Sequence, residues 1–191
     1  LGDVYKRQHY KYVKKLLGHK NLIIEKPFLK NFKQFLEIKK NIKLSKKSRV
    51  VVNYIDLYNP LIKGIKKKLN KQFNKIIFEY SDSKSYFKKK YLCTEDWIEH
   101  PLSLILFLFK KFTKFKIVKK LFIHKNNQYL EKVKIQFLYK KKVVIIEINF
   151  KNSKKRRIYF YKKNKLLSFV DLKNNKIQDK KNFNNLFYLY K

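Results

Sequence analysis

The stretch "NLIIEKP", residues 21–27, joins a short apolar run to an acid, a base and a proline. The apolar run has the length and composition of a buried strand. Pro27 disfavours helical backbone at Lys26, which holds the acid and the base at the tip of that strand. Open parallel sheets bind ligands outside the carboxyl ends of their strands, so Glu25 and Lys26 are candidate ligand-binding residues. A solvent-exposed lysine in a strand-to-helix loop is the alternative interpretation.

Strands alternate with helices on both sides of this stretch. Apolar residues at helical spacing predict one helix over residues 10–17, ending near Gly18, and another over residues 32–42. The valine-rich "SRVVVNYI", residues 48–55, predicts a second buried strand. Asn59-Pro60 then predicts the cap and the first position of a third helix. This alternation is typical of right-handed crossovers between the strands of a parallel sheet.

The pattern changes after about residue 72. "NKIIFEYSD" predicts one strand, and the strongly apolar "HPLSLILFLFKKF" predicts a buried helix. Beyond that helix the chain shows strand-like runs separated by polar turns such as "KKNK", over residues 115–124, 131–139, 142–151, 156–161, 166–171 and 186–190. Partial alternation of apolar and polar residues favours a predominantly antiparallel open sheet covered on one face. The fold class predicted is therefore α/β followed by α+β.

The charge of the chain has two explanations. Lys and Arg number 50 against 13 Asp and Glu, a formal net charge of +37, which would suit phosphate neutralisation in a basic RNA-binding or ribosomal-type protein. Only four of the basic residues are arginine, alanine is absent, and Lys, Asn, Ile, Phe and Tyr abound, as an AT-rich coding bias produces. The RNA-binding alternative predicts basic and aromatic residues gathered on one exposed face. We expect no specific nucleic-acid partner.

Cysteine usage and apolar runs bound the remaining classes. Cys93 is the sole cysteine, so the sequence holds no disulfide framework and no cysteine-based zinc site, and we expect no metal. The longest apolar run, residues 102–109, is far shorter than the ~20 residues that a membrane-spanning helix needs. No signal peptide is visible. We expect a cytoplasmic protein without a membrane partner.

The first residues differ from the rest of the chain. The sequence begins at Leu1 and contains no methionine, and "LGDVYKRQ", residues 1–8, looks like a scar of sequence assembly. We exclude these residues from fold reasoning. The expectation is that the chain is the C-terminal piece of a longer protein.

A second candidate site lies in "TEDWIEHPLS", residues 94–103. Asp96 and His100 stand four residues apart, which on a helix places a carboxylate beside an imidazole. A carboxylate that orients a histidine raises its basicity, as a general base requires. Pro101 disfavours helical backbone at His100, so the alternative is a polar loop before a helix that starts at Pro101.

A third candidate follows the second predicted strand. In "NYIDLYNP", residues 53–60, Tyr54 and Tyr58 are placed to line a cleft at the carboxyl end of that strand. Half-buried packing is the alternative interpretation of both aromatic residues.

The order of these three motifs resembles that of a known family. "NLIIEKP", "VVVNYIDLYNP" and "EDWIEHPLSL" are similar, in this order, to motifs of the Gfo/Idh/MocA oxidoreductases, and the resemblance extends from residue 9 onward. It implies that residues 9–72 are the C-terminal part of a Rossmann-like dinucleotide-binding domain. It also implies that residues 73–191 are a substrate and oligomerisation domain with an antiparallel sheet.

The resemblance implies a function and roles for particular residues. The intact protein would be an NAD(P)-dependent oxidoreductase that moves a hydride between nicotinamide and a small, sugar-like substrate with a hydroxyl or carbonyl group. Asp96 and His100 would supply the acid/base group, and Lys26 would lie beside both nicotinamide and substrate. The cofactor-binding residues implied are Glu25, Lys26 and Pro27, and the substrate-binding residues are Tyr54, Tyr58 and Trp97. A non-catalytic scaffold with the same fold is a further alternative.

The chain departs from the family pattern at three places. Leu92-Cys93-Thr94 stands where the family shows small glycines, and Ile55-Asp56-Leu57 stands where an arginine is common. The glycines of this chain, Gly2, Gly18 and Gly64, form no G-x-G-x-x-G phosphate loop. We therefore expect this fragment to be inactive alone. Because exposed open sheets often pair, we expect the intact protein to be a homo-oligomer.

Overall fold

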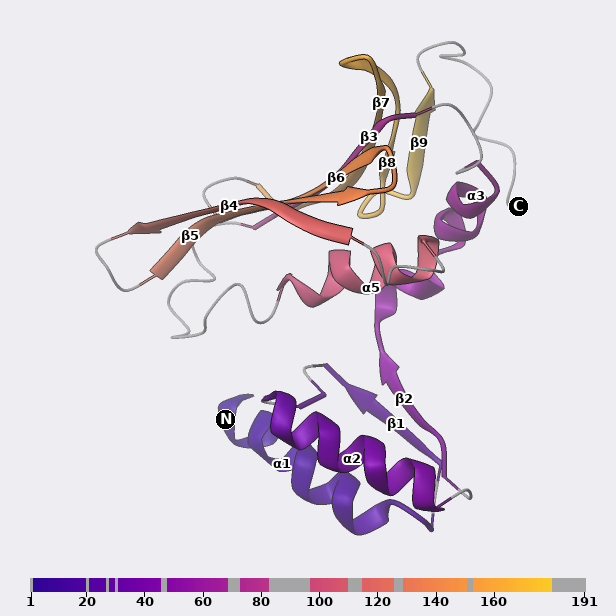
Figure 1. Cartoon of the computed structure of the whole chain (residues 1–191), viewed down its shortest axis with the longest axis vertical. Coiled ribbons are helices and arrows are strands. Elements are labelled where there is room, and N and C mark those ends of the chain that lie inside the picture. The colour runs from indigo at the N-terminus through magenta and orange to yellow at the C-terminus, as the bar shows by residue number, and fades with distance from the viewer. Residues whose placement is uncertain are drawn as a thin grey trace. The chain divides into compact units, whose positions relative to one another are not determined.

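The computed structural model describes residues 2–19, 21–26, 28–29, 31–45, 48–68, 73–82, 97–109, 115–125, 129–150 and 153–179. The chain forms two compact units, residues 1–55 and residues 56–191 (Figure 1). Each unit has its own buried apolar cluster. The predicted succession of an α/β segment and an α+β segment is confirmed by their secondary structure.

The first unit contains two helices and a two-stranded parallel sheet. Helix α1 spans Gly2–Leu16 and α2 spans Phe32–Ser45, while strand β1 spans Leu22–Glu25 and β2 spans Val50–Asn53. The strands pair in parallel, as the alternating pattern predicts. Both helices lie beside the sheet in Figure 1, and they meet it through a cluster centred on Val13, Ile24 and Ile38.

Local hydrogen bonds explain where these elements begin and end. The Asn31 side chain accepts from the backbone N–H of Gln34 at 3.0 Å, which caps the start of α2. After α1 the chain passes through Gly18 at φ 96°, a left-handed conformation that suits glycine. The Gly18 N–H donates to the Ser48 hydroxyl at 2.8 Å, so the end of α1 is tied to the segment before β2.

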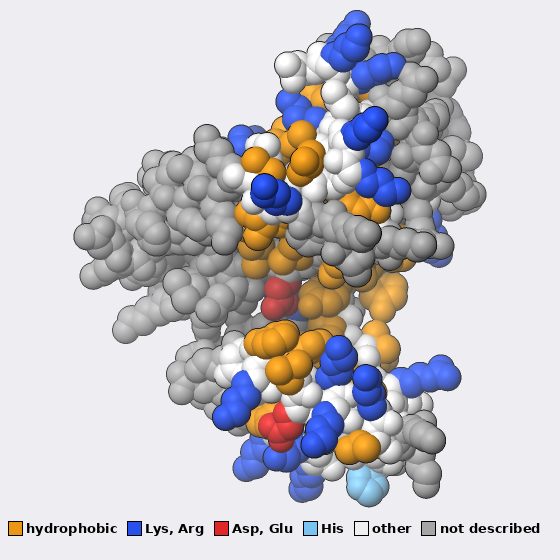
Figure 2. Space-filling view, in the orientation of Figure 1, with side chains coloured by type: hydrophobic (Ala, Val, Ile, Leu, Met, Phe, Trp, Pro, Cys, Tyr) orange, Lys and Arg blue, Asp and Glu red, His pale blue; other side chains and the backbone are white. Residues whose placement is uncertain are grey.

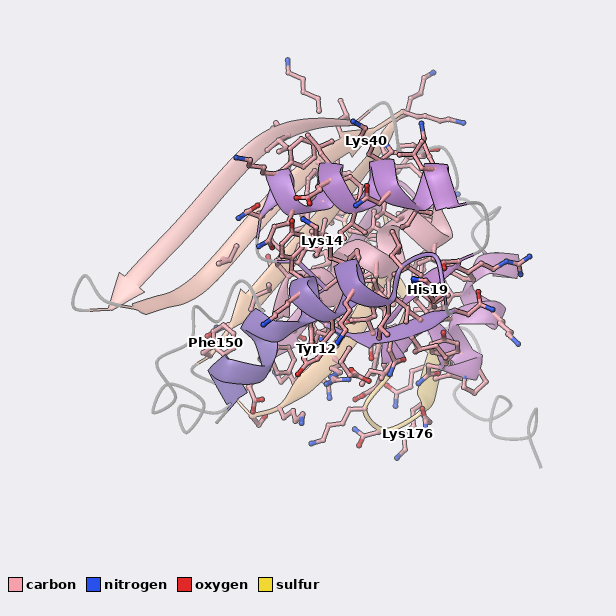
Figure 3. The ribbon with its side chains drawn as sticks, turned by 90° about the horizontal axis from the view of Figure 1, so that it is seen from below. Tyr12, Lys14, His19, Lys40, Phe150 and Lys176 are labelled. Atoms are coloured by element: carbon pink, nitrogen blue, oxygen red, sulfur yellow. The ribbon has the colours of Figure 1, made fainter. Side chains whose placement is uncertain are left out.

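The two helices are also joined by polar contacts. Lys14 of α1, labelled in Figure 3, lies 2.8 Å from a carboxylate oxygen of Glu37 on α2. The Tyr10 hydroxyl donates to the other oxygen of Glu37. These contacts are exposed to solvent, so their contribution to stability is small beside that of the apolar cluster.

The other face of this sheet is apolar and exposed. Ile23 and Val51 are partners in the parallel register, and they remain 81% and 44% exposed. Ile24, one position along the strand, is buried because side chains alternate between the two faces of a strand. Exposed apolar residues beside open strand edges favour aggregation.

The second unit is built on a seven-stranded sheet. Its strands are β3 Lys75–Ser81, β4 Phe115–Lys125, β5 Tyr129–Tyr139, β6 Lys142–Asn149, β7 Lys155–Lys162, β8 Lys165–Asp171 and β9 Lys176–Asp179. The order across the sheet is β4-β5-β6-β3-β7-β8-β9. Strand β3 pairs in parallel with β6, whereas the other pairs are antiparallel, which confirms the predominantly antiparallel sheet. Strand β9 was not predicted, and the strand expected over residues 186–190 lies outside the described residues.

One face of this sheet carries the main core. Helix α5, Glu99–Leu108, contributes Leu104 and Leu108 to a cluster that includes Phe78 and Ile146 of the sheet. The helix therefore covers one face, as the apolar segment predicts. The turn between β7 and β8 falls within "KKNK", with Lys163 and Asn164 at φ 45° and 62°, as a tight two-residue hairpin turn requires.

Helix α3, Pro60–Lys68, belongs with the second unit. Asn59 caps it by accepting from the Leu61 N–H at 3.0 Å, which confirms the predicted cap and the proline at the first position. Ile62 and Ile65 are buried in the main core, so α3 packs with the large sheet. The domain boundary near residue 72 stays a prediction for the intact protein.

Lysine and arginine side chains are dispersed on the face that Figure 2 shows. In that view the described lysine and arginine side chains lie on both units, beside hydrophobic and other side chains. Some of the described lysines lie in ion pairs, such as Lys134 with Glu147 at 2.5 Å. A dispersed arrangement of this kind is what a compositional bias produces.

Candidate active site

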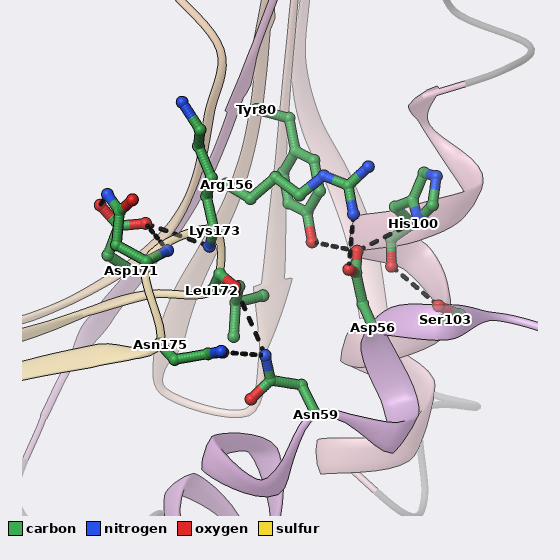
Figure 4. A network of polar contacts seen from close by, with 11 residues as sticks. Asp56, Asn59, Tyr80, His100, Ser103, Arg156, Asp171, Leu172, Lys173 and Asn175 are labelled. Carbon is green, nitrogen blue, oxygen red and sulfur yellow. Dashed lines mark hydrogen bonds and ion pairs between the residues drawn. The ribbon is translucent and has the colours of Figure 1, made fainter.

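A buried carboxylate is the centre of a network of polar contacts inside the second unit (Figure 4). Asp56 lies in a short 3-10 helix, Ile55–Tyr58, and is only 5% exposed. An Arg156 Nη1 donates to its Oδ1 at 3.0 Å, and the Tyr80 hydroxyl donates to its Oδ2 at 3.0 Å. The Nδ1 of His100 lies 3.1 Å from the same Oδ2.

The sheet brings two of these groups together by register. Tyr80 of β3 and Arg156 of β7 are direct partners in the antiparallel pairing. Both lie on the core face, because they share the parity of Phe78 and Ile158 along their strands. The otherwise apolar face of the sheet therefore carries a hydroxyl and a guanidinium side by side, and Asp56 accepts a hydrogen bond from each.

His100 enters from the first turn of α5 and is 3% exposed. Pro101 does not displace it, since a proline in the first turn of a helix removes no intrahelical hydrogen bond. The Ser103 hydroxyl donates to the His100 carbonyl at 2.8 Å. The imidazole stacks on the Tyr80 ring, with 6.1 Å between centroids and 20° between planes, and lies 5.9 Å from the Trp97 ring. These contacts confine the imidazole beside the carboxylate.

The contact between His100 and Asp56 is electrostatic in this geometry. Its 3.1 Å is an ion-pair distance, but the oxygen lies off the direction of an Nδ1–H bond, so Nδ1 has no aligned hydrogen-bond partner. Catalytic hydrogen bonds are often poorly aligned without substrate and tighten when it binds.

The charges around Asp56 decide its ionisation. Burial by itself raises the pKa of the Asp56 carboxyl, but the groups around it, His100 first and then Arg156, outweigh burial and hold that pKa below its ordinary value. Burial also raises the pKa of Tyr80 well above its ordinary value, and the Asp56 charge raises it further. At neutral pH the site therefore holds a carboxylate that accepts from a neutral phenol and a guanidinium.

This ionisation predicts a loss of stability in acid. Because the folded-state pKa of Asp56 is lowered, its contribution to stability is present above the unfolded-state pKa, about 3.9, and is lost as the pH falls through the folded-state value. We expect the free energy of unfolding to decrease as the pH is lowered beyond about 4. In Asp56→Asn this decrease should be smaller, because the titrating carboxyl group is gone. Denaturant titrations across this range measure it. An unchanged acid slope in Asp56→Asn would contradict the prediction.

The structure describes two of the three candidate site residues in this segment. His100 and Trp97 lie in the described part, whereas Asp96 lies outside it. Trp97 is 4% exposed, packs on the Tyr80 ring with 6.1 Å between centroids, and has the Arg156 guanidinium over its ring at 5.4 Å. It forms part of the wall around the Asp56 network.

The residues predicted to bind cofactor belong to the first unit. Glu25 ends β1 and accepts from the Asn53 side-chain amide at the end of β2, at 2.5 Å. Lys26 follows β1 and is half-buried, and Pro27 lies outside the described residues. Glu25 and Asn53 thus meet at the carboxyl ends of both parallel strands, the edge where such sheets bind ligands.

The two tyrosines of the third motif differ in exposure. Tyr54 is half-buried in the first unit, and Tyr58 is 66% exposed in the second. Their role in substrate binding stays a prediction.

Sequence reasoning missed the carboxylate, the phenol and the guanidinium of this network. From the sequence, Asp56 stands out only as a departure from a family pattern, although an acid inside an apolar motif of so basic a chain is itself a signal. Arg156 stands two positions before Ile158, and Tyr80 two positions after Phe78, so alternation along β7 and β3 could have placed both on the core face.

The described residues contain no group of three or more His, Cys, Asp or Glu side chains that could hold a metal ion. Among the helices described, none is both long and apolar enough to cross a membrane.

Comparison with known proteins identifies the fold. No protein-family model and no curated protein matches this chain. Solved structures do: a dehydrogenase (MviM) from Clostridium difficile matches with a TM-score of 0.76 and 17% identity, over 92% of this chain and 57% of that one. The UDP-N-acetylglucosamine 3-dehydrogenase GnnA from Acidithiobacillus ferrooxidans matches with a TM-score of 0.75 and 14% identity, over 90% and 57%.

A third structure was solved with ligands. KijD10, a 3-ketoreductase from Actinomadura kijaniata in complex with NADP and TDP-benzene, matches with a TM-score of 0.71 and 10% identity, over 87% of this chain and 54% of that one. The chain thus spans little more than half the length of these proteins. It has the fold of the corresponding part of these oxidoreductases, and identities this low extend the likeness to the fold alone.

Proposed function

We propose that this chain is part of an NAD(P)-dependent oxidoreductase that acts on a small, sugar-like molecule. The observation that carries the proposal is the buried pair of Asp56 and His100, 3.1 Å apart, in a fold shared with dehydrogenases and a ketoreductase. An imidazole beside a carboxylate is the arrangement that proton transfer to and from a hydroxyl group uses. The UDP-N-acetylglucosamine in the name of GnnA supports a sugar derivative as the substrate class, and the TDP-benzene bound to KijD10 supports a molecule joined to a nucleoside diphosphate.

The protein residues would handle the proton while the nicotinamide, when bound, supplies the hydride chemistry. In the oxidative direction the substrate carbon loses a hydride, and His100 accepts the proton that leaves the hydroxyl oxygen. In the reductive direction His100 returns that proton to the oxygen. Lys26 would be a further catalytic residue, as the Glu-Lys-Pro motif implies, and Asp96, as the Asp-x-x-x-His motif implies, would assist His100.

The carboxyl edge of the small parallel sheet suits the ribose and nicotinamide end of a dinucleotide. Glu25 offers a carboxylate to ribose hydroxyl groups, and Asn53 orients it from the neighbouring strand. The sequence holds no G-x-G-x-x-G loop for the pyrophosphate, so residues outside these 191 would have to supply it. NAD and NADP both fit these residues.

Lys26→Ala tests the proposal in the protein extended by its upstream sequence. We expect that protein to bind NAD or NADP in calorimetry, and these 191 residues alone not to bind measurably. Lys26→Ala should lower kcat by about 10²-fold or more while the dissociation constant of the cofactor changes little, because the proposed role of Lys26 is catalytic.

Lys40→Ala is the matched control, since Lys40 is exposed on α2 (Figure 3) and should leave both constants unchanged. Equal turnover in the Lys26→Ala and Lys40→Ala variants would contradict the catalytic role of Lys26. Stoichiometric dinucleotide binding by the 191 residues alone would show that the cofactor site lies elsewhere.

The open face of the large sheet supports the expectation of a homo-oligomer. Tyr159 and Phe169 are register partners on the face away from α5, with 5.7 Å between their rings, and both remain partly exposed. We expect light scattering on the extended protein to give a mass above that of one chain, and Tyr159→Glu to reduce it because the charge would be buried in the contact. Phe32→Glu, at an exposed aromatic residue of α2, is the control. A monomeric parent protein would contradict this prediction.

A further inference from the structure

We infer that Asp56 is the positioning residue of His100: its carboxylate holds the imidazole with Nδ1 inward, which leaves Nε2 as the atom that exchanges a proton. The catalytic consequence rests on the function proposed above. The positioning itself is a property of the second unit, and it can be tested without any substrate. It assigns to the segment after β2 a role that the sequence motif gives only to Asp96.

Burial makes this contact strong and selective. The side chains of His100 and Asp56 are 4% and 6% exposed, so little water screens the charge that lies 3.1 Å from Nδ1. The groups that face Asp56 are the imidazole, the Tyr80 hydroxyl and the Arg156 guanidinium, which come from three other elements of the fold. The carboxylate is thus a meeting point of α5, β3 and β7.

Both partners are held in place by further contacts. Arg156 occupies Oδ1 and Tyr80 occupies Oδ2, so the carboxylate cannot rotate without breaking a charge-assisted hydrogen bond. The imidazole is stacked on Tyr80 and flanked by Trp97, and these ring contacts restrict its movement. One lone pair on Oδ2 remains for Nδ1, because a carboxylate oxygen accepts more than one hydrogen bond.

The position of the carboxylate selects a tautomer. A carboxylate accepts hydrogen bonds and does not donate them, so it favours the neutral imidazole with its proton on Nδ1. Nε2 then carries the lone pair that accepts a proton. An asparagine at position 56 would instead present an amide N–H to Nδ1 if its oxygen stayed on Arg156, and the preferred tautomer would change to Nε2–H.

The test reads the tautomer directly by ¹⁵N NMR of histidine side chains. These 191 residues contain four histidines, and His100→Gln identifies the signal of His100 by its loss. We expect the parent protein to show the Nδ1–H form at His100, and Asp56→Asn to show the Nε2–H form while the other three signals stay in place. An Nε2–H form in the parent protein would overturn the inference without any variant.

Asp171→Asn is the matched control. Asp171 is 5% exposed like Asp56 and accepts from an arginine, Arg157, at 3.0 Å on the same sheet, but it makes no contact with His100. A general loss of packing would affect both variants, whereas positioning predicts a change of tautomer only in Asp56→Asn. The same change in both variants, or in neither, would overturn the inference.

Kinetics separate this inference from the proposed function. In the protein extended upstream, Asp56→Asn should lower kcat by at least about 10²-fold, and Asp171→Asn by no more than about 2-fold, because a wrong tautomer disables the base. A change of tautomer in a protein without hydride transfer would support the positioning and reject the oxidoreductase. Full turnover with an unchanged tautomer in Asp56→Asn would reject the positioning and leave the oxidoreductase standing.

Discussion

His100→Asn should lower kcat by about 10²- to 10⁴-fold in the protein extended by its upstream sequence, because the imidazole is the proposed carrier of the substrate proton. Asparagine keeps a polar side chain of similar size but cannot exchange a proton near neutral pH. Cofactor binding should change little, since the proposed ribose contact is Glu25, oriented by Asn53, and His100 is not part of it. Nicotinamide absorbance measures the turnover, and calorimetry measures the binding.

His19→Asn is the control for this prediction. His19 is exposed in the first unit and is labelled in Figure 3, so its replacement should leave kcat within about 2-fold. If His100→Asn and His19→Asn turned over substrate equally fast, His100 would not be the acid/base group. A base elsewhere in the site would then have to be sought.

Arg156→Met should lower the free energy of unfolding by about 3–5 kcal/mol, because it leaves the buried Asp56 carboxylate without its cationic partner. The Arg156 side chain is 18% exposed and the Asp56 side chain 6%, so solvent cannot replace the lost hydrogen bond well. Methionine retains much of the apolar stem of Arg156 and removes only the guanidinium, which lies over the Trp97 ring. Denaturant unfolding followed by tryptophan fluorescence suits the measurement, since Trp97 is the sole tryptophan.

Arg49→Met provides the comparison, because Arg49 is exposed and its change should alter stability by no more than about 0.5 kcal/mol. A double variant adds a sharper test. Once Asp56→Asn has removed the charge, Arg156→Met should cost less than it does alone, and the difference is the coupling between the two residues. Additive losses would show that the two side chains act independently.

Much of the fold follows from local patterns. "NLII" and "RVVV" are short apolar runs between amphipathic helices, and they form the parallel pair of β1 and β2. Asn59-Pro60 caps α3 as its chemistry predicts. These features are predictable because a cap or a strand depends on residues close together in the sequence. The prediction that both strands are buried is wrong for one face of the pair, since Ile23 and Val51 are exposed.

The place of β3 in the sheet was beyond local patterns. Its sequence, "KIIFEYS", predicts a strand but not its neighbours. The strand inserts between β6 and β7, with one parallel and one antiparallel partner, and both partners follow it by more than sixty residues. Pairing over such distances depends on which apolar faces can share one core, and no short window of sequence contains that information.

The candidate site divides in the same way. The sequence makes His100 a candidate, because a histidine in the Asp-x-x-x-His spacing has a chemical meaning within a single motif. Lys26 is a candidate from its strand tip and proline, and its role stays a prediction. The carboxylate next to His100 in the structure is Asp56, and its donors Tyr80 and Arg156 come from two strands far apart in the sequence. A buried charge is stable only where several partners converge on it, and that convergence arises when the sheet, the 3-10 segment and α5 pack together.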